Sequence, residues 1–492
     1  MVEFDFDSTK KMGILKGENF DDIREYFSVK NEGAKFMRRY GRFLPPRTYA
    51  ITPTGRFEPC LVEEIKKYIT EKQITGGQIF SKDLFDTVYP ARHGWHQQLD
   101  FKNEILPLKI PLRDYQEEIV KKCLFNGRGT IILATAGGKT LTSASLLTKI
   151  YSIYKSPYNK NTFKCLFIVP DRGLVEQTSQ DFIDYNVPFK VSKWTGDDDL
   201  DLTSDVIVAN IGILQSKNSN LDWIEGIDVL VVDEVHKIRK GNEINKILKR
   251  VKTPHRFGFT GTMPEDKLDQ WNIIGKIGPV IYEKHSYDLR QDNYITGAQI
   301  QVLKLNHKLP ERDIPPIGDN ASDKYRAEVK YLIQSQFRNR TISTLMGNLK
   351  NNSLVMVDYI EHGELLYDII KEQHPSKQVF FIRGEVEITE REKVRQLMEL
   401  HNDIIVVAIS KIFSTGVNIK NLHYIIFACG GKAKIKIVQS IGRGLRLHKD
   451  KTQLIIFDIA DNYRYSSAHL DKRISLYEKE KIKFAIKEIT EK

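Results

Sequence analysis

The chain repeats one pattern twice: a short apolar run rich in β-branched residues, then a stretch with helical spacing. The apolar runs do not alternate strictly with polar residues, which suits strands buried on both faces of a sheet. Strands that alternate with helices form parallel sheets in α/β domains. The first set of runs covers 130–134, 165–170, 205–210, 228–234 and 256–262.

The same pattern resumes further along the chain. A stretch at 306–322, rich in Pro, Asp and Asn, is typical of an exposed loop near a domain boundary. The sequence therefore predicts two parallel-sheet α/β domains in tandem, at 106–290 and 291–470. The second set of runs covers 353–359, 378–384, 403–410, 423–431 and 452–460.

Both ends of the chain differ from this pattern. Residues 1–105 are expected to form a small α+β accessory domain, and 471–492, where charged and apolar residues alternate at helical spacing, a charged surface helix. The segment 35–56 holds six basic residues and no acid, with aromatic residues between them. Uncompensated charge favours a polyanion, although arginine packed on aromatic rings is also common on surfaces. The candidate contacts to nucleic acid there are Arg38, Arg39 and Arg42.

Composition excludes several classes of protein. Of 492 residues, 41% are hydrophobic and 28% charged, as in ordinary globular proteins, and the net charge of +11 fits a polyanionic partner. The four cysteines form no CxxC pair, which argues against a zinc site or a disulfide framework and fits a reducing compartment. The first residues do not resemble a signal peptide, and no apolar run reaches the ~20 residues that span a bilayer. We therefore expect a cytoplasmic protein.

The segment LATAGGKT at 133–140 lies between a strand-like and a helix-like run. A tight loop at a helix N-terminus directs backbone N–H groups and the helix dipole at one point, which suits a phosphate. We expect Ala136, Gly137 and Gly138 to line the phosphates of ATP, Lys139 to reach the β and γ phosphates, and Thr140 to bind Mg²⁺. The strict pattern has Gly at its first position, so a Gly-Gly turn before a helix is the alternative.

A second candidate is VLVVDEVH at 229–236, where a buried strand ends in two carboxylates. The carboxyl ends of parallel strands are where α/β sheets bind ligands. Asp233 would hold Mg²⁺ and Glu234 would orient and deprotonate the attacking water. Asp-Glu also begins many helices, so this pattern alone is weak evidence for a nucleotide site. It indicates nucleotide hydrolysis because it follows the phosphate-loop pattern in the same α/β unit.

The third candidate is QSIGRGLRLHK at 439–449. Arg443 and Arg446 are three residues apart and so share one face of a helix. Arginine near a γ-phosphate stabilises the charge that develops in the transition state. A solvated basic helix is the alternative.

Read together, these segments resemble the ordered motifs of superfamily 2 helicases, over residues 110 to 465. The further matching segments are RDYQ (113–116), IVPDRGLVEQ (168–177), TGT (260–262), SLVMVDYIEHGELL (353–366) and ISKIFSTGVNIKNL (409–422). The resemblance implies two RecA-like domains that bind ATP and Mg²⁺. By this resemblance, Gln116 would contact adenine and Gly416 would contact the nucleotide. The implied DNA contacts are Arg172, Gln177, Arg383 and Thr415, and the implied coupling residues are His236, Thr260, Thr262 and Gln439.

The chain is similar, more narrowly, to the UvsW family of tailed-phage helicases. The segments that carry this likeness are YGRF at 40–43, GRFEPCLVEEIKKYI at 55–69, FSTGVNIKNLHY at 413–424 and IVQSIGRGLR at 437–446. The likeness implies an ATP-driven enzyme that remodels branched and duplex DNA: fork regression, Holliday junction migration, and dissolution of D-loops and R-loops, with 3′ to 5′ translocation. We expect the chain to be a monomer in solution. An RNA helicase, the motor subunit of a restriction-type nuclease complex, and a non-catalytic DNA-binding scaffold are the alternatives.

Overall fold

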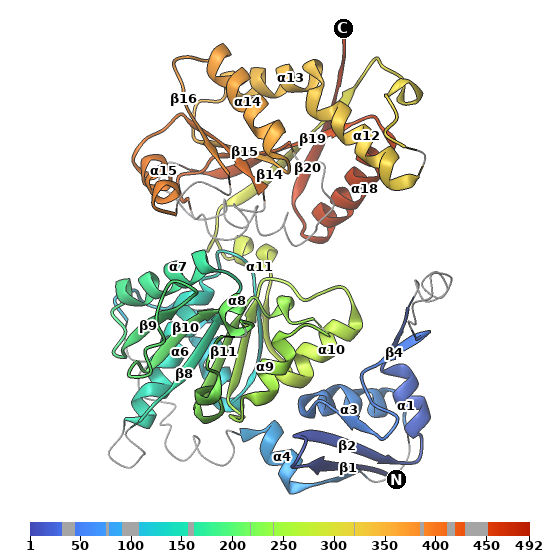
Figure 1. Ribbon diagram of the computed structural model, residues 1–492, viewed down its shortest axis with the longest axis vertical. Coiled ribbons are helices and arrows are strands. Elements are labelled where there is room, and N and C mark those ends of the chain that lie inside the picture. The colour runs from blue at the N-terminus through green and yellow to red at the C-terminus, as the bar shows by residue number, and fades with distance from the viewer. Residues whose placement is uncertain are drawn as a thin grey trace. The chain divides into compact units, whose positions relative to one another are not determined.

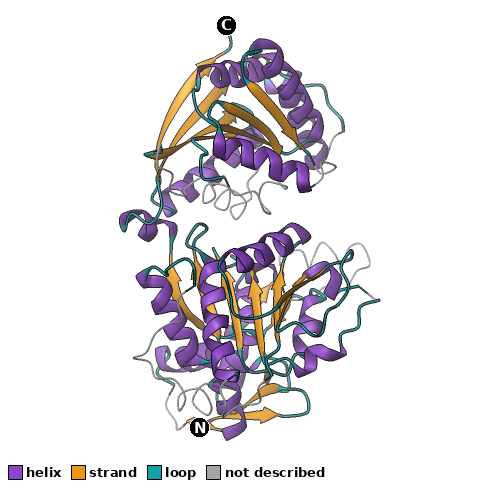
Figure 2. Cartoon of the chain, turned by 90° about the vertical axis from the view of Figure 1, so that its left-hand side faces the viewer, coloured by secondary structure: helices purple, strands orange, loops and turns teal. Residues whose placement is uncertain are grey.

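The structure is a computed structural model, and its chain forms two compact units. The first contains Met1–Leu133 and Gly138–Lys284, and the second contains Ala134–Gly137 and His285–Lys492. Each unit holds a parallel sheet with helices on its faces (Figures 1 and 2), so the predicted tandem of RecA-like α/β domains is confirmed. The structure describes residues 1–31, 45–74, 78–90, 108–155, 162–216, 218–239, 241–318, 320–383, 388–410, 419–428 and 451–492.

The sheet of the first unit has the order β13-β7-β12-β11-β8-β10-β9 within the described residues, and every pairing is parallel. The five predicted strands are all present, and the short strands β9 and β13 were not predicted. The strands are β7 (Gly129–Leu133), β8 (Cys165–Val169), β9 (Val191–Trp194), β10 (Val206–Asn210), β11 (Val229–Asp233), β12 (Arg256–Thr260) and β13 (Val280–Lys284).

Buried apolar side chains explain the position of these strands. Every residue of β7, β8 and β10 is buried, as expected for strands covered by helices on both faces. Because the strands are parallel, the loops that follow β7, β11 and β12 leave from the same edge of the sheet. The helices are α5 (Asp114–Asn126), α6 (Lys139–Tyr154), α7 (Arg172–Asp184), α8 (Ile211–Leu214), α9 (Ile244–Arg250) and α10 (Lys267–Lys276).

The second sheet has the order β16-β17-β15-β18-β19-β14-β20 in the described part of the chain and is also parallel throughout. Its strands are β14 (Gly297–Asn306), β15 (Ser353–Val357), β16 (Gln378–Ile382), β17 (Ile404–Ile409), β18 (Tyr424–Phe427), β19 (Gln453–Asp461) and β20 (Lys483–Thr490). Its helices are α11 (Ser286–Gln291), α12 (Ala321–Gln334), α13 (Gln336–Asn348), α14 (Ile360–Gln373), α15 (Ile388–Leu400) and α18 (Arg464–Lys479).

Two predictions about this unit are wrong. The stretch 306–322 is not a domain boundary, because β14 before it already lies between β19 and β20 in the second sheet. The helix predicted over 471–492 ends at Lys479, and residues 483–490 form the edge strand β20. Pairing with β14 overrides the helical spacing of charges in that segment.

The first residues form the expected α+β module. Its main sheet has the order β5-β2-β1-β6 among described strands, and β3 pairs with β4. Its core also contains Trp271 of α10, and Glu58 of the module forms an ion pair with buried Lys276. The module is thus packed on the first RecA-like domain. Its elements are β1 (Val2–Asp7), β2 (Met12–Gly17), α1 (Phe20–Tyr26), β3 (Ser28–Lys30), β4 (Arg47–Tyr49), β5 (Arg56–Phe57), α3 (Val62–Glu71), β6 (Gln78–Phe80) and α4 (Lys82–Val88).

Candidate nucleotide site and motor residues

The loop between β7 and α6 has the conformation that a phosphate loop needs. Ala136 and Gly138 both have left-handed backbones, with φ of 69° and 80°. Glycine avoids backbone strain at Gly138, and a Cβ there would lie 2.3 Å from Nε2 of Gln116 and displace the end of that side chain. Lys139 is the first residue of α6, so the loop directs the N-terminus of this helix at the carboxyl edge of the sheet.

The side chain of Gln116, in α5, contacts this loop. The N–H of Arg113 donates to its Oε1 at 2.9 Å, and its Nε2 donates to the carbonyl of Gly138 at 3.5 Å. The side chain is only 2% exposed. Gln116 therefore links the start of α5 to the phosphate loop, and its predicted contact with adenine stays a prediction.

Lys139 and Glu234 meet at the carboxyl edge of the sheet. Their Nζ and Oε1 atoms are 3.6 Å apart, and the side chains are 12% and 14% exposed. Glu234 has a left-handed backbone, with φ of 52°, which turns the chain at the end of β11. Oδ1 of Asp233 accepts the N–H of Glu234 at 2.9 Å. The two strongest sequence motifs are thus brought into contact.

A buried polar chain continues from Glu234. Nδ1 of His236 lies 3.1 Å from Oε2 of Glu234 and 3.0 Å from Oγ1 of Thr260. The Thr260 hydroxyl donates to the carbonyl of Thr262 at 2.9 Å. His236 and Thr260 are 3% and 0% exposed. Lys139, Glu234, His236, Thr260 and Thr262, which come from three separate motifs, therefore form one connected network.

Thr140 and Asp233 suit a magnesium ion. No group of three or more His, Cys, Asp or Glu side chains that could hold a metal occurs among the described residues. Mg²⁺ in nucleotide sites takes only one or two protein ligands and keeps water and phosphate oxygens for the rest. One carboxylate at the end of β11 and one hydroxyl in the first turn of α6 match that requirement.

The described candidates for DNA contact have different surroundings. Arg172, at the start of α7, is 55% exposed and pairs with Asp197 at 2.8 Å. Arg383, just after β16, is 40% exposed and pairs with Glu364 at 2.7 Å. Gln177 is half-buried, and its Oε1 is buried with no hydrogen-bond partner among the described residues. The arginines are thus accessible, whereas the carbonyl of Gln177 is directed inward.

The other predicted site residues lie outside the described residues. They are Arg38, Arg39, Arg42, Thr415, Gly416, Gln439, Arg443 and Arg446.

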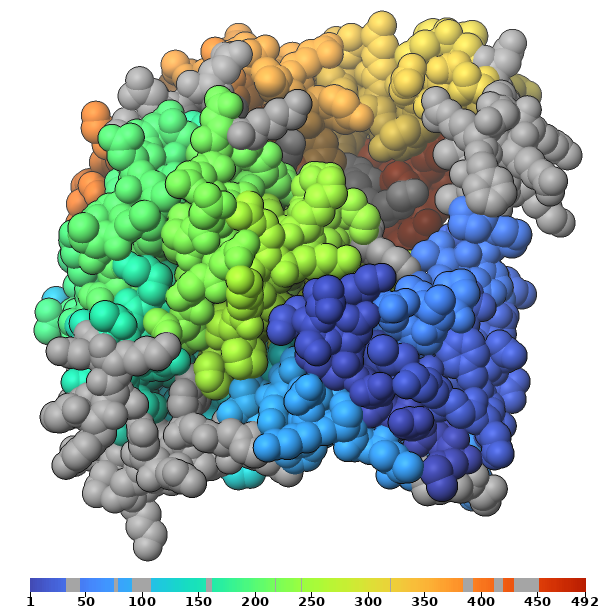
Figure 3. All heavy atoms as spheres, turned by 60° about the horizontal axis from the view of Figure 1, so that its bottom comes forward, coloured from blue at the N-terminus to red at the C-terminus, as the bar shows by residue number. Residues whose placement is uncertain are grey.

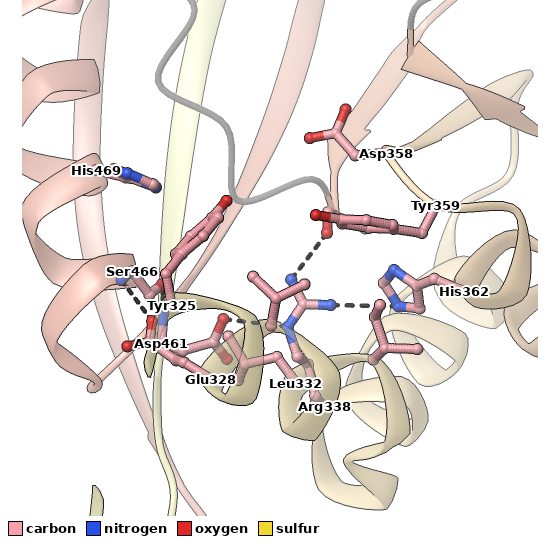
Figure 4. Close-up of a pocket in the computed structure, with 13 residues that line it drawn as sticks. Tyr325, Glu328, Leu332, Arg338, Asp358, Tyr359, His362, Asp461, Ser466 and His469 are labelled. Atoms are coloured by element: carbon pink, nitrogen blue, oxygen red, sulfur yellow. Dashed lines mark hydrogen bonds and ion pairs between the residues drawn. The ribbon is translucent and has the colours of Figure 1, made fainter. Parts of the chain in front are cut away.

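Sequence reasoning missed a buried charged cluster in the second domain (Figure 4). Arg338 of α13 is 3% exposed; its Nε lies 3.1 Å from Oδ2 of Asp461 and its Nη2 donates to the carbonyl of Ala428 at 2.9 Å. Oδ1 of Asp461 lies 2.8 Å from His307. Burial opposes ionisation of Asp461, but Arg338 and His307 outweigh it and lower its pKa. Burial, reinforced by the Arg338 guanidinium, lowers the pKa of His362 to about 3.

This cluster surrounds a cavity of about 50 Å³ and ties neighbouring elements together. Glu328 accepts the N–H groups of Tyr465 and Ser466 at 3.0 and 2.7 Å, at the start of α18. Asp358, which follows β15, accepts a hydrogen bond from the Ser410 hydroxyl at the end of β17. Charged residues within amphipathic helices read as surface positions, so no sequence signal separated Arg338 from its exposed neighbours.

Two family profiles match the chain. Residues 109–265 match "Type III restriction enzyme, res subunit" and residues 338–448 match "Helicase conserved C-terminal domain". The first match spans the strands from β7 to β12 with the phosphate loop, and the second spans the strands from β15 to β18 with the motifs of the second domain. No helix among the described residues is both long and apolar enough to cross a bilayer.

Individual proteins resemble the chain over most of its length. The ATP-dependent DNA helicase uvsW of Enterobacteria phage T4 is 26% identical over 510 residues, covering 96% of this chain and 95% of the phage protein. The DNA 3′-5′ translocase XPB2 of Sulfurisphaera tokodaii is 25% identical, covering 80% and 88%. The structure of the ATP-dependent type ISP restriction-modification enzyme LlaBIII bound to DNA has a TM-score of 0.55 at 16% identity, covering 90% of this chain and 36% of that one, which shows a shared fold.

Proposed function

We propose that this chain, a member of the superfamily 2 helicases and an ATP-hydrolysing DNA helicase, remodels branched DNA. Its activities would be regression of stalled forks, branch migration of Holliday junctions, and dissolution of D-loops and R-loops, with translocation 3′ to 5′. The observation that carries the proposal is the similarity to the phage T4 DNA helicase, which runs through the accessory module as well as both sheets. The proposed setting is the cytoplasm of a phage-infected cell.

The chemical step is supported by the network at the carboxyl edge of the first sheet. Lys139 would bind the β and γ phosphates, and Glu234, 3.6 Å away, would orient the attacking water and accept its proton. When bound, Mg²⁺, held by Thr140 and Asp233, would neutralise charge that develops on the phosphate oxygens. Ala136, Gly137 and Gly138 would line the phosphates, Gln116 the adenine, and Gly416, Arg443 and Arg446 would contribute from the second domain.

Coupling to DNA would pass through the same network. Departure of the γ-phosphate would change the Lys139–Glu234 contact, and His236 contacts both Glu234 and Thr260. The Thr260 hydroxyl is hydrogen-bonded to the carbonyl of Thr262, so a movement of side chains at the nucleotide would be transmitted to the loop after β12. ATP can drive such a change only if it binds one state more tightly than the other. Gln439 would be the coupling residue of the second domain.

The proposed partner is DNA held by its phosphate backbone. Arg172, Arg383 and Thr415, with the arginines at 38, 39 and 42, would contact phosphates, and Gln177 would position the segment near them. Contacts of this kind carry no sequence information and weaken as salt rises. We propose that the chain works as a monomer.

A substrate panel tests the proposal. The purified chain would be given a model fork, a four-way junction, a D-loop, an R-loop, a blunt duplex and a single-stranded RNA, each with and without ATP. We expect ATP-dependent products from the branched substrates, and none with the Glu234→Gln variant, which keeps the size of the side chain but cannot accept the proton. ATPase activity that RNA stimulates more than forked DNA would instead favour an RNA helicase.

The profile match to a restriction-enzyme subunit supports a second candidate, the motor of a nuclease complex. That candidate predicts metal-dependent cleavage of DNA. Backbone cleavage by the purified chain on the substrate panel would support this candidate and contradict remodelling as its sole activity.

A further inference from the structure

A cluster of basic side chains lies at the edge of the first sheet where its strands begin. Arg128 directly precedes β7, and Arg256 is the first residue of β12. The N-terminal ends of parallel strands lie at the same edge of a sheet. At ~3.3 Å per residue, the length of β7 separates this edge from the phosphate loop by about 15 Å. The site is therefore separate from the proposed ATP site, although it lies on the same two strands.

The guanidinium groups of Arg128 and Arg256 are held by backbone carbonyls. Nε, Nη1 and Nη2 of Arg128 donate to Ile277, Thr87 and Lys276 at 2.8, 2.9 and 2.9 Å. The same atoms of Arg256 donate to the carbonyls of residues 253, 276 and 251 at 3.0, 3.0 and 2.6 Å. Both groups thus share the carbonyl of Lys276. Carbonyls satisfy the donors without neutralising the charge, and each guanidinium has five N–H donors.

The third cation is Lys276, which is 3% exposed and paired with Glu58 of the module. Burial lowers its pKa; Glu58 opposes that effect, and Lys249 and Arg256 add to it. Burial, reinforced by the charge of Arg128, lowers the pKa of Arg256 to about 10. Arg128 and Lys276, each 3% exposed, and half-buried Arg256 therefore repel one another beside Glu58, the carboxylate that pairs with Lys276.

These groups line a cavity of about 270 Å³ between the module and the first domain. Figure 3 shows this face, where the dark blue start of the chain meets the yellow-green residues near 250. Four exposed lysines at positions 10, 11, 249 and 252 also line it, and the acidic side chains on its wall are Glu58 and Asp86. Lys252 pairs with Glu225 at 2.7 Å. Seven basic side chains thus face two acidic ones across the same space.

Capping of α10 accounts for only part of this arrangement. The carbonyls of Lys276 and Ile277 lie at the C-terminus of α10, where arginine is favourable. One cationic side chain would satisfy that helix end. Two arginines, a buried lysine and a rim of lysines around an open cavity exceed what a cap requires.

We propose that this cavity binds a phosphate group, supplied either by the DNA backbone or by a soluble phosphate compound. A doubly charged oxyanion would supply the negative charge that the cluster lacks, and its oxygens would accept from the lysine ammonium groups and from the arginine N–H groups that the carbonyls leave over. The cavity, of about 270 Å³, has room for such a group. The site would join the module to the first domain whether or not the chain acts on branched DNA.

The test uses the full chain carrying Lys139→Ala, which weakens anion binding at the ATP site. Inorganic pyrophosphate is titrated by calorimetry, and a short blunt duplex by fluorescence anisotropy at several salt concentrations. The variant is Lys249→Gln, and the matched control is Lys246→Gln, on the same helix but away from the cavity. Neither side chain is buried, so both variants should fold.

If soluble phosphate is the ligand, Lys249→Gln weakens pyrophosphate binding several-fold and leaves duplex binding unchanged. If the DNA backbone is the ligand, Lys249→Gln weakens duplex binding and lowers the slope of log K against log salt by about 0.9, and pyrophosphate competes with the duplex. Equal behaviour of the two variants in both titrations would overturn the proposal. That result would leave the branched-DNA proposal untouched, because the substrate panel measures a different activity.

Discussion

At the scale of single residues, Ala136 is the least expected feature of the phosphate loop. It is a non-glycine residue with φ of 69°. A left-handed backbone costs an L-residue about 1–2 kcal/mol, and glycine avoids that cost. Ala136→Gly should therefore increase the free energy of unfolding by up to about 1 kcal/mol, after allowing for the extra freedom of glycine in the unfolded chain. Urea unfolding of the two proteins measures the change.

Ala144→Gly is the control for this substitution. Ala144 lies in α6, where glycine costs about 1 kcal/mol relative to alanine. The two substitutions should thus change stability in opposite directions. A loss of stability in Ala136→Gly equal to that in Ala144→Gly would show that the loop does not hold Ala136 in the left-handed region.

The network through Thr260 gives a second prediction at this scale. Thr260→Val keeps the shape of the side chain but removes the hydroxyl that contacts His236 and Thr262. We expect a fall of about tenfold in DNA-stimulated kcat, equivalent to about 1.4 kcal/mol, with little change in KM for ATP. Steady-state ATPase assays with and without DNA measure it.

Thr148→Val is the matched control. Thr148 is buried in α6, and its hydroxyl has no hydrogen-bond partner among the described residues. Removing that hydroxyl should leave both kinetic constants unchanged. A similar loss in both variants would indicate a general effect on packing and would count against coupling through Thr260.

The sequence predicted most of this network because its members sit in short motifs beside apolar strands. Lys139, Glu234, His236, Thr260 and Thr262 were all proposed, and the structure connects them. The actual partner of Gln116 was not foreseen, since it depends on how closely α5 approaches the loop. A contact between two elements of this kind produces no periodic pattern in the sequence from which it could be predicted.

At the scale of elements, the contact between the module and α10 gives the next prediction. A Cβ on Gly275 would lie 2.4 Å from Cβ of Glu58, which cannot swing away as a side-chain tip could. Gly275→Ala should therefore destabilise the packed pair by about 1–3 kcal/mol, even though alanine favours the helix by ~1 kcal/mol. Thermal unfolding followed by Trp271 fluorescence measures the effect, because this side chain lies in the core of the module.

The control at this scale is Gly226→Ala. Gly226 is exposed, and a Cβ there would meet nothing within 4 Å. We expect no loss of stability from that substitution. If Gly275→Ala is equally neutral, the module does not pack on α10 as closely as described.

Elements with one exposed face were the hardest to predict. The ten strands found from sequence are continuous apolar runs, whereas β9, β13, β14 and β20 mix apolar with polar or charged residues. Strand β20 has the burial pattern of an edge strand, and its charges are spaced as in a helix. Its identity is decided by pairing with β14, a long-range contact that local sequence does not encode.

At the scale of the whole molecule, the buried histidine of the second domain makes stability depend on pH. The pKa of His362 is about 3 when folded, against about 6.5 when unfolded. Below pH 6.5 the unfolded chain therefore binds a proton that the folded chain does not bind until about pH 3. In that window, lowering the pH should decrease the free energy of unfolding, by up to ~1.4 kcal/mol per pH unit from this group.

Calorimetric unfolding between pH 5 and 7.5 tests this prediction. His362→Gln should flatten the dependence of Tm on pH, because the variant lacks the titrating group. His401→Gln is the control, since His401 is exposed. An unchanged pH dependence in His362→Gln would show that His362 does not stay neutral in the folded domain.

The place of β14 in the second sheet has a consequence for biosynthesis. Both of its neighbours, β19 and β20, are encoded roughly 150 residues or more downstream, so at ~5–20 residues per second β14 waits many seconds for them on the ribosome. Its edges stay unsatisfied throughout that interval. Slow translation or a shortage of chaperones should therefore lower the yield of the folded second domain, because β14 can pair only after these downstream strands have been made.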